Sequence, residues 1–153
     1  MVGKNINLLK WHNFFLDFRF HGPIAIIYFA QVTGSYALGL AIFSIASVSS
    51  TIFEVPTGIL SDHIGRKKTI IFGSAASILA ISSYAIANTF LILIIGAIFE
   101  GLASSFFSGN NDALLYDTLK QQKQTKKFSE KLGKISSMFQ AGLGISALIG
   151  GFI

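Results

Sequence analysis

The chain has 153 residues, of which 52% are hydrophobic and only 12% are charged, and its formal net charge is +5. This composition is typical of a membrane protein and not of a soluble domain. Because cysteine is absent, disulfides and thiolate metal sites are excluded. The basic residues lie between apolar runs and not on one amphipathic face, which argues against a nucleic-acid partner.

Five apolar stretches are predicted to cross a membrane as helices. They cover approximately residues 14–30, 36–58, 69–87, 90–119 and 132–153. A helix of about 20 residues is long enough, at about 1.5 Å per residue, to cross a hydrocarbon core of about 30 Å. The predicted fold class is therefore an all-α membrane protein with about five transmembrane helices.

The first span contains charged residues. Asp17 and Arg19 interrupt what should be the uncharged core of a signal peptide, so we expect this segment to be retained. Pro23 removes one backbone hydrogen bond inside the span and is expected to kink the helix and shape its packing.

The second and fourth spans have distinct patterns. The second is rich in Ala, Ser and Gly, which let helix backbones approach closely in lipid. The fourth is too long for a simple perpendicular crossing, and its later half, from Ser108 to Asp117, is polar. We expect that half to leave the bilayer or to face other protein.

Charge placement predicts the orientation. The amino terminus, the turn after the second span and the loop after the fourth hold every lysine and arginine except Arg19 and Lys134. The alternate turns hold none. By the positive-inside rule the basic side, including the amino terminus, is cytoplasmic.

The turn between the second and third spans carries a motif. Asp62 and Arg66 are four residues apart, where helical continuity would make them neighbours. The turn resembles the signature loop of the major facilitator superfamily, Gly-x-Leu-x-Asp-x-x-Gly-Arg-Lys/Arg. The matching residues are Gly58, Leu60, Asp62, Gly65, Arg66 and Lys67. Glu54-Val55-Pro56-Thr57 and the segment 111–117 also resemble a bacterial multidrug or metabolite exporter branch of that superfamily.

The resemblance implies a secondary transporter with two six-helix halves that rock about a central site. Residues 1–153 would supply helices one to five of the amino-terminal half, without helix six or the carboxy-terminal half. We therefore expect a fragment or a truncated gene product that lies in a bacterial cell membrane. The alternatives are a non-transporting membrane protein or remnant, and one half of a two-chain transporter.

The resemblance also implies roles for the motif. The aspartate and arginine of this turn clamp the cytoplasmic gate in the family, with an acid at the inner end of helix four as partner. Asp117 is the candidate for that acid. The competing structural interpretation is that Asp62 and Arg66 form a surface ion pair worth less than about 1 kcal/mol.

Other polar residues near the apolar runs are candidates for a cavity or for coupling. Asp17, Arg19 and Glu100 would cost at least about 2.5 kcal/mol if ionised in the membrane, so they should face a partner or a water-filled cavity. Two interpretations are open for these charged residues. In the functional one they contact substrate or couple protons, and in the structural one they neutralise one another, for example Arg19 with Glu100. We expect the next three polar residues either to line the inner cavity or to cap a helix end: Asn110, Asn111 and Asp112.

Two further patterns bear on transport. Many proton-coupled members of the superfamily relay protons through an arginine at the position where this chain has Ala97. The alanine argues against the same arginine-based relay in this chain. The last span keeps a ladder of glycines found in exporters, which favours export: Gly133, Gly142, Gly150 and Gly151. The expected partners are the lipid bilayer, a small-molecule substrate, protons and a carboxy-terminal half.

An enzyme is not expected. The sequence has no histidine pair at metal spacing, no nucleophile in a glycine-rich elbow and no phosphate-binding glycine loop. No catalytic residue, cofactor or metal is therefore predicted.

Overall fold

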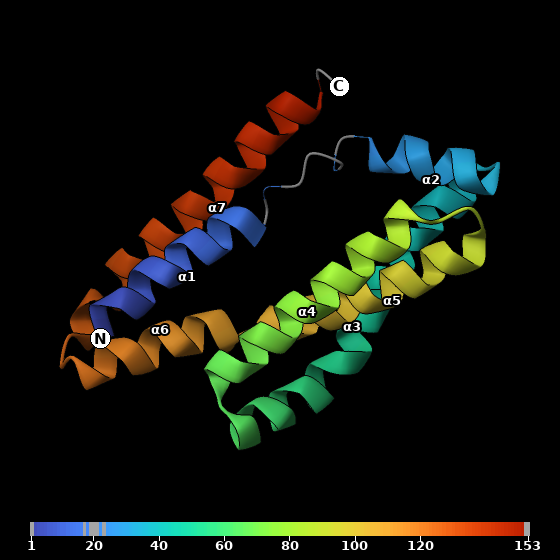
Figure 1. Cartoon of the computed structure of the whole chain (residues 1–153). Helices are drawn as coiled ribbons and strands as arrows, with labels where there is room; N and C mark the ends of the chain where they lie inside the picture. Colours follow the sequence, from blue (N-terminus) through green and yellow to red (C-terminus); the bar gives the residue numbers. More distant parts are fainter. Residues whose placement is uncertain (1, 17, 19–21, 23, 152–153) are drawn as a thin grey trace. The chain divides into compact units, whose positions relative to one another are not determined.

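A computed structural model describes residues 2–16, 18, 22 and 24–151 (Figure 1). All regular structure in these residues is helical, which confirms the predicted all-α class. The elements are α1 (Val2–Leu16), α2 (Ala25–Thr33), α3 (Tyr36–Ile64), α4 (Arg66–Ala85), α5 (Phe90–Phe107), α6 (Asn110–Gln121), the short 3₁₀ helix η1 (Thr125–Lys127) and α7 (Phe128–Gly150).

The chain forms two compact units. One comprises residues 26–110, and the other comprises residues 1–25 together with 111–153. The first unit contains most of α2 and all of α3, α4 and α5, whereas the second contains α1, most of α6, η1 and α7. Each unit has its own packing and is described by itself.

In the unit of residues 26–110, α5 packs along both α3 and α4, which touch each other far less. Small residues allow this approach. A Cβ atom added at Gly101 would lie 2.5 Å from Ser49 Cβ and 2.7 Å from the Ser50 backbone nitrogen. One added at Gly73 would lie 2.7 Å from the Phe107 ring. Close backbone packing of this kind holds membrane helices together where lipid supplies no hydrophobic driving force.

Helix α2 is tied to the end of α4. The Tyr28 hydroxyl lies 2.8 Å from the Tyr84 carbonyl oxygen and 3.0 Å from that of Ala87, and it donates to this pair of acceptors. The Phe29 ring packs against the Tyr84 ring, with centroids 5.0 Å apart. The Tyr28 hydroxyl thus adds a side-chain donor at the end of α4, where intrahelical donors run out.

In the other unit, α1 packs alongside α7 (Figure 1). A Cβ atom at Gly142 would lie 2.5 Å from the Phe14 carbonyl oxygen, so only glycine fits there without a shift. Ile135, Gly142, Ser146 and Gly150 are the buried residues of α7. Their spacing of seven, four and four residues places them on one face of the helix.

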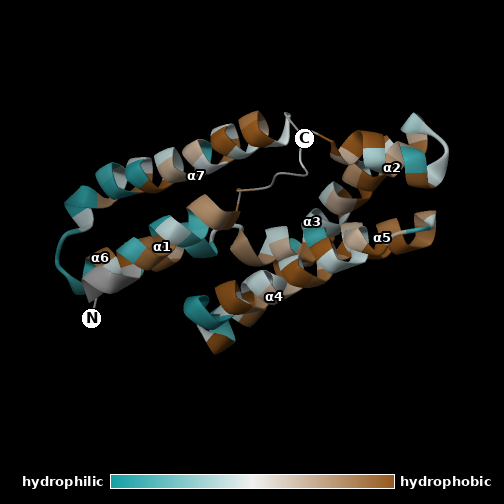
Figure 2. Ribbon diagram, turned by 45° about the horizontal axis from the view of Figure 1, so that its top comes forward, coloured by the Kyte–Doolittle hydropathy of each residue, from teal (hydrophilic) through white to brown (hydrophobic). Residues whose placement is uncertain are grey.

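Four helical segments among the described residues are long and apolar enough to cross a membrane, namely 36–64, 66–85, 90–121 and 125–150. Many large apolar side chains on them are exposed, as expected for surfaces that face lipid. Figure 2 shows the hydrophilic colour at the α3–α4 turn and at the start of α7. The predicted first span, 14–30, falls partly on residues 17, 19–21 and 23, which lie outside the described residues.

The predicted fourth span, 90–119, corresponds to two helices. Helix α5 ends at Phe107, Gly109 has φ +69°, and α6 begins at Asn110. The break lies where the sequence turns from apolar to polar.

Candidate functional site

The turn from α3 to α4 depends on one glycine. Gly65 has φ +89°, a conformation that residues with a Cβ rarely adopt. Its backbone N–H donates to the Ser61 carbonyl oxygen at 2.9 Å, and its own carbonyl oxygen accepts from the buried Thr69 hydroxyl at 3.1 Å. Helix α4 therefore begins at the next residue, Arg66, with the guanidinium group beside the end of α3.

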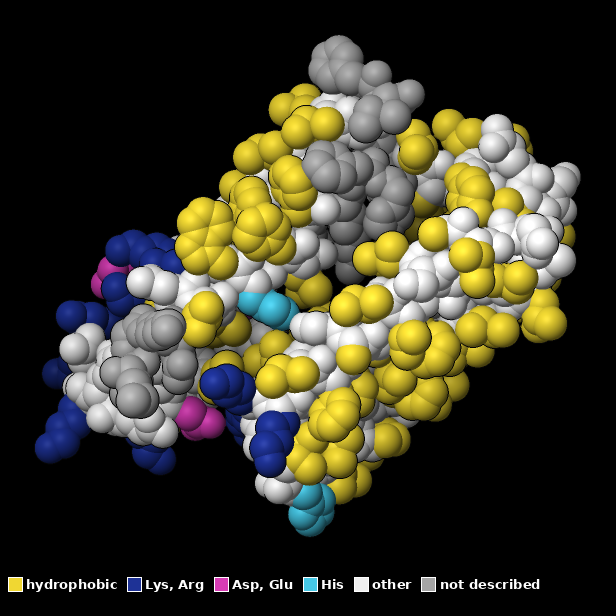
Figure 3. Space-filling model, viewed as in Figure 1, with side chains coloured by type: hydrophobic (Ala, Val, Ile, Leu, Met, Phe, Trp, Pro, Cys, Tyr) yellow, Lys and Arg dark blue, Asp and Glu magenta, His cyan; other side chains and the backbone are white. Residues whose placement is uncertain are grey.

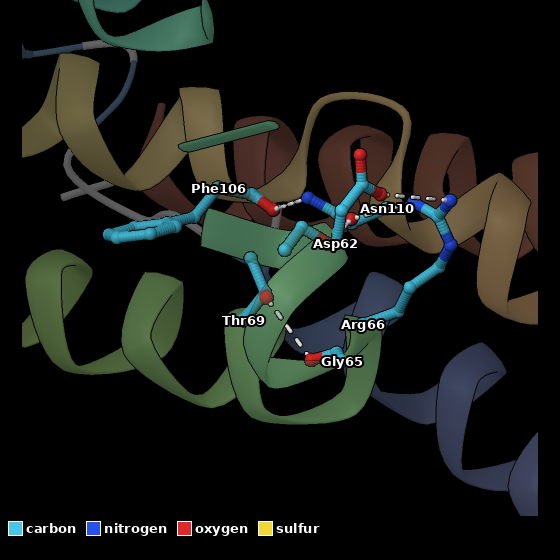
Figure 4. Close-up of polar contacts among 7 residues, drawn as sticks. Asp62, Gly65, Arg66, Thr69, Phe106 and Asn110 are labelled. Atoms are coloured by element: carbon cyan, nitrogen blue, oxygen red, sulfur yellow. Dashed lines mark hydrogen bonds and ion pairs between the residues drawn. The ribbon is translucent and has the colours of Figure 1, made fainter. Parts of the chain in front are cut away.

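Arg66 is held by an amide and a carboxylate (Figure 4). Its Nη1 donates to Asn110 Oδ1 at 3.1 Å, and its Nη2 lies 3.7 Å from Asp62 Oδ1. The Asp62 side chain is 74% exposed, whereas that of Arg66 is 34% exposed. An ion pair this exposed stabilises little. The contact with the buried Asn110 therefore has the larger part in orienting the guanidinium group.

Asn110 is the centre of this arrangement. It is only 3% exposed, and its Oδ1 also accepts from the hydroxyl of Ser61, which is 1% exposed. Its Nδ2 donates to the Phe106 carbonyl oxygen at 2.9 Å. One amide thus connects the end of α3, the first residue of α4 and the last turn of α5. We call Ser61, Arg66 and Asn110 the turn network.

Two further polar contacts join α3 to α5 beside the turn network. The Thr57 hydroxyl lies 3.3 Å from the Ser105 carbonyl oxygen, and the Ser108 hydroxyl donates to Glu54 Oε1 at 3.1 Å. Glu54, Thr57 and Ser61 are three and four residues apart and so share one face of α3. Thr57 is buried, whereas Glu54 and Ser108 are exposed, so the contact of Thr57 has the larger part in fixing α3 against α5.

The remaining motif residues lie on the surface. Gly58, Leu60 and Lys67 are exposed, and no atom lies within 4 Å of a Cβ built at Gly58. Asp117 is exposed on α6 and belongs to the unit that contains residues 111–153. Its pairing with Arg66 stays a prediction.

Glu100 has a partner on the neighbouring helix. Its Oε2 accepts from the Tyr84 hydroxyl at 2.8 Å. Gly96, one turn earlier on α5, makes room for that ring, because a Cβ there would lie 2.6 Å from a ring carbon of Tyr84. Arg19 lies outside the described residues, as do Asp17 and Pro23, so the pairing of Arg19 with Glu100 stays a prediction.

The other candidate residues differ in their surroundings. Asn111 is half-buried and Asp112 is exposed, both in the first turn of α6. In the glycine ladder, Gly142 and Gly150 are buried, whereas Gly133 and Gly151 are exposed. Among the described residues, no group of His, Cys, Asp and Glu side chains could hold a metal ion.

Sequence reasoning identified Asp62, Arg66 and Asn110 but missed Ser61. Ser61 occupies a variable position of the motif. The available signal was a hydroxyl one turn before Gly65, at the end of a helix whose last carbonyl groups need partners.

Comparison with known proteins agrees with the motif. The family model described as Major Facilitator Superfamily matches residues 13–153. An uncharacterized transporter of Buchnera aphidicola from Schizaphis graminum is 34% identical over 113 residues, which cover 70% of this chain and 27% of the relative. An uncharacterized MFS-type transporter of Methanocaldococcus jannaschii is 29% identical over 139 residues, which cover 90% of this chain and 35% of the relative. No solved structure matches.

The matched regions amount to between 27% and 35% of the length of these two curated relatives. The family match covers nearly the whole chain, and four of its helical segments have the length and composition of membrane spans. The chain therefore belongs to the Major Facilitator Superfamily and is a multi-pass membrane protein.

Proposed function

We propose that this chain forms part of a secondary transporter and that its α3–α4 turn acts as the cytoplasmic gate. Transport by alternating access needs a second set of helices across the substrate pathway. We therefore propose that the chain works together with a carboxy-terminal half, in a bacterial cell membrane and with its amino terminus in the cytoplasm. The family relationship favours a transporter over an enzyme.

The observation that carries the gate proposal is the fixed position of Arg66. Its guanidinium group is held by Asn110, whose amide is itself anchored to Ser61 and to the Phe106 carbonyl group. A charged group held in one direction by buried partners is preorganised for a further contact. On this proposal, Asp117 and the opposing half supply that contact when the gate closes.

The exposed Asp62 supports the same proposal. Its carboxylate lies beside Arg66, yet 74% of the side chain is accessible. Such a group can dock against a polar or positive surface of an opposing half without breaking the contact between Arg66 and Asn110. Lys67 and Lys68 are exposed on the same turn, where they set the topology and contact lipid headgroups.

Glu100 is the proposed coupling or cavity residue. It lies within α5, and the Tyr84 hydroxyl donates to it from α4. A carboxylate at that depth is costly in a membrane unless it is paired or hydrated, which is why such residues mark substrate or proton pathways. We propose that Glu100 acts in proton or ion coupling, and that export is the direction favoured by the glycines of α7.

The test is gradient-driven transport in proteoliposomes that contain this segment together with a carboxy-terminal half. The probe is any compound from a panel of radiolabelled organic cations, sugars and amino acids that the unmodified protein carries. Asp62→Asn and Arg66→Ala should each reduce the rate at least about tenfold, whereas the control Lys67→Gln should keep most of it. Normal transport by Asp62→Asn and by Arg66→Ala would show that the gate assignment is wrong.

A further inference from the structure

The positive charge of this chain is concentrated in one segment. Residues 120–134 contain six lysines and one glutamate, a formal charge of +5, which equals the net charge of the whole chain. Acidic and basic residues balance in the rest of the sequence. The excess positive charge therefore belongs to the connection from α6 to α7 and to the first turns of α7.

This connection has a defined structure. Helix α6 ends at Gln121, η1 follows at Thr125–Lys127, and α7 begins at Phe128. The Gln124 N–H donates to the Leu119 carbonyl oxygen at 2.9 Å, which closes the end of α6. The Tyr116 and Phe128 rings meet edge to face, with centroids 5.8 Å apart. The two helices are therefore joined by a packed aromatic contact at the base of the turn.

The lysines divide into two groups. Lys131 and Lys134 share the carboxylate of Glu130, with Nζ to Oε1 distances of 3.8 and 2.7 Å. The other four are exposed and form no ion pair within the described part of the chain: Lys120, Lys123, Lys126 and Lys127. We call these four the lysine cluster. Figure 3 shows Lys and Arg side chains gathered at the end of the unit where α6 leads into α7.

We propose that the lysine cluster binds the headgroups of anionic lipids. Lys120 and Lys123 precede the segment Thr125–Gly150, which is long and apolar enough to cross the membrane, and Lys126 and Lys127 lie in its first three residues. On this proposal all four ammonium groups lie at headgroup depth. Clusters of four or more basic residues in this position attract anionic lipids, by about 1 kcal/mol for each residue near the surface. Tyr116, which is 46% exposed beside the cluster, has the amphipathic ring that favours the same interface.

Topology alone does not explain this arrangement. The positive-inside rule needs basic residues in a short loop but does not require them to be ordered or unpaired. Here the turn is held by the contact between Tyr116 and Phe128, and Glu130 is taken up by Lys131 and Lys134. The four lysines of the cluster thus form no ion pair among the described residues, which leaves their charge available to an external anion. The lipid proposal is independent of the gate proposal.

The test places a reporter at the turn. Trp11 is the only tryptophan of the chain, so Trp11→Phe combined with Phe128→Trp gives a single fluorophore beside the lysine cluster. The full chain is reconstituted into phosphatidylcholine vesicles that contain brominated phosphatidylglycerol or brominated phosphatidylcholine at equal mole fraction. We expect brominated phosphatidylglycerol to associate with the turn about fivefold more strongly than brominated phosphatidylcholine. This ratio corresponds to about 1 kcal/mol, the interaction expected of roughly one lysine. The preference should disappear near 1 M salt, where the screening length is about 3 Å.

Matched variants separate charge from folding. Replacing the four lysines by glutamine should abolish the lipid preference, whereas replacing them by arginine should retain it. Far-UV circular dichroism checks that each variant keeps its helices. Equal quenching by the two lipids, or a preference that survives the four glutamines in a folded chain, would overturn the proposal.

Discussion

Replacing Asn110 tests the turn network directly. Asn110→Ala removes the acceptor that serves both the Ser61 hydroxyl and Arg66 Nη1, as well as the donor to the Phe106 carbonyl oxygen. The Ser61 hydroxyl is then left at a position that is only 1% exposed. We expect the free energy of unfolding to fall because buried polar groups lose their partners.

The magnitude follows from these contacts. Leaving a buried polar group without a partner costs about 1 to 3 kcal/mol, whereas hydrogen bonds between membrane helices average about 0.6 kcal/mol in double-mutant cycles. We therefore expect Asn110→Ala to cost about 2 kcal/mol. The coupling energy between Asn110→Ala and Ser61→Ala should be about 1 kcal/mol.

The assay is equilibrium unfolding in mixed micelles with increasing fractions of a denaturing detergent, followed by circular dichroism. The control is Gln121→Ala on the same helix, because Gln121 is exposed. This surface substitution should change the unfolding free energy by less than about 0.5 kcal/mol. Strictly additive losses for Ser61→Ala and Asn110→Ala would refute the contact that defines the network.

Further substitutions follow from the packing, the backbone conformation and the hydrogen bonds of the described residues. Gly101→Ala should lower the unfolding free energy by about 1 to 3 kcal/mol in the same micelle assay, because the added Cβ meets the α3 backbone. The control is Gly144→Ala, where no atom lies within 4 Å of the added Cβ, and it should raise the unfolding free energy by about 0.5 kcal/mol. Gly65→Ala should cost about 1 to 2 kcal/mol, since φ +89° disfavours a side chain, and an unchanged thermal midpoint would contradict this. Tyr84→Phe should cost about 1 kcal/mol by removing the donor to Glu100. The same substitution should cost much less in a chain that already carries Glu100→Ala, and an equal loss in both backgrounds would contradict the pairing.

Much of the fold was accessible from the sequence because its causes are local. Long apolar runs predict helices, and the Gly65 turn follows from a polar segment between two such runs. The break between α5 and α6 had a local signal in Ser108-Gly109, although the hydropathy of the preceding residues favoured one long span.

The turn network was less accessible because it joins distant parts of the chain. Asn110 lies 44 residues from Arg66 and 49 from Ser61. Helical periodicity shows which face of a helix is buried but not which residue of another helix it meets. For that reason Asn110 was predicted only as a cavity or capping residue. The pairing of Glu100 with Tyr84 was missed for the same reason.

The central claim is that Asn110 orients Arg66 for its role in the gate. The most direct test is the transport rate of Arg66→Ala, Asn110→Leu and the double variant, in a transporter that contains this segment and a carboxy-terminal half. If the two residues act together, the double variant should transport at the rate of Arg66→Ala alone. A double variant slowed by the product of the two single effects would contradict the claim.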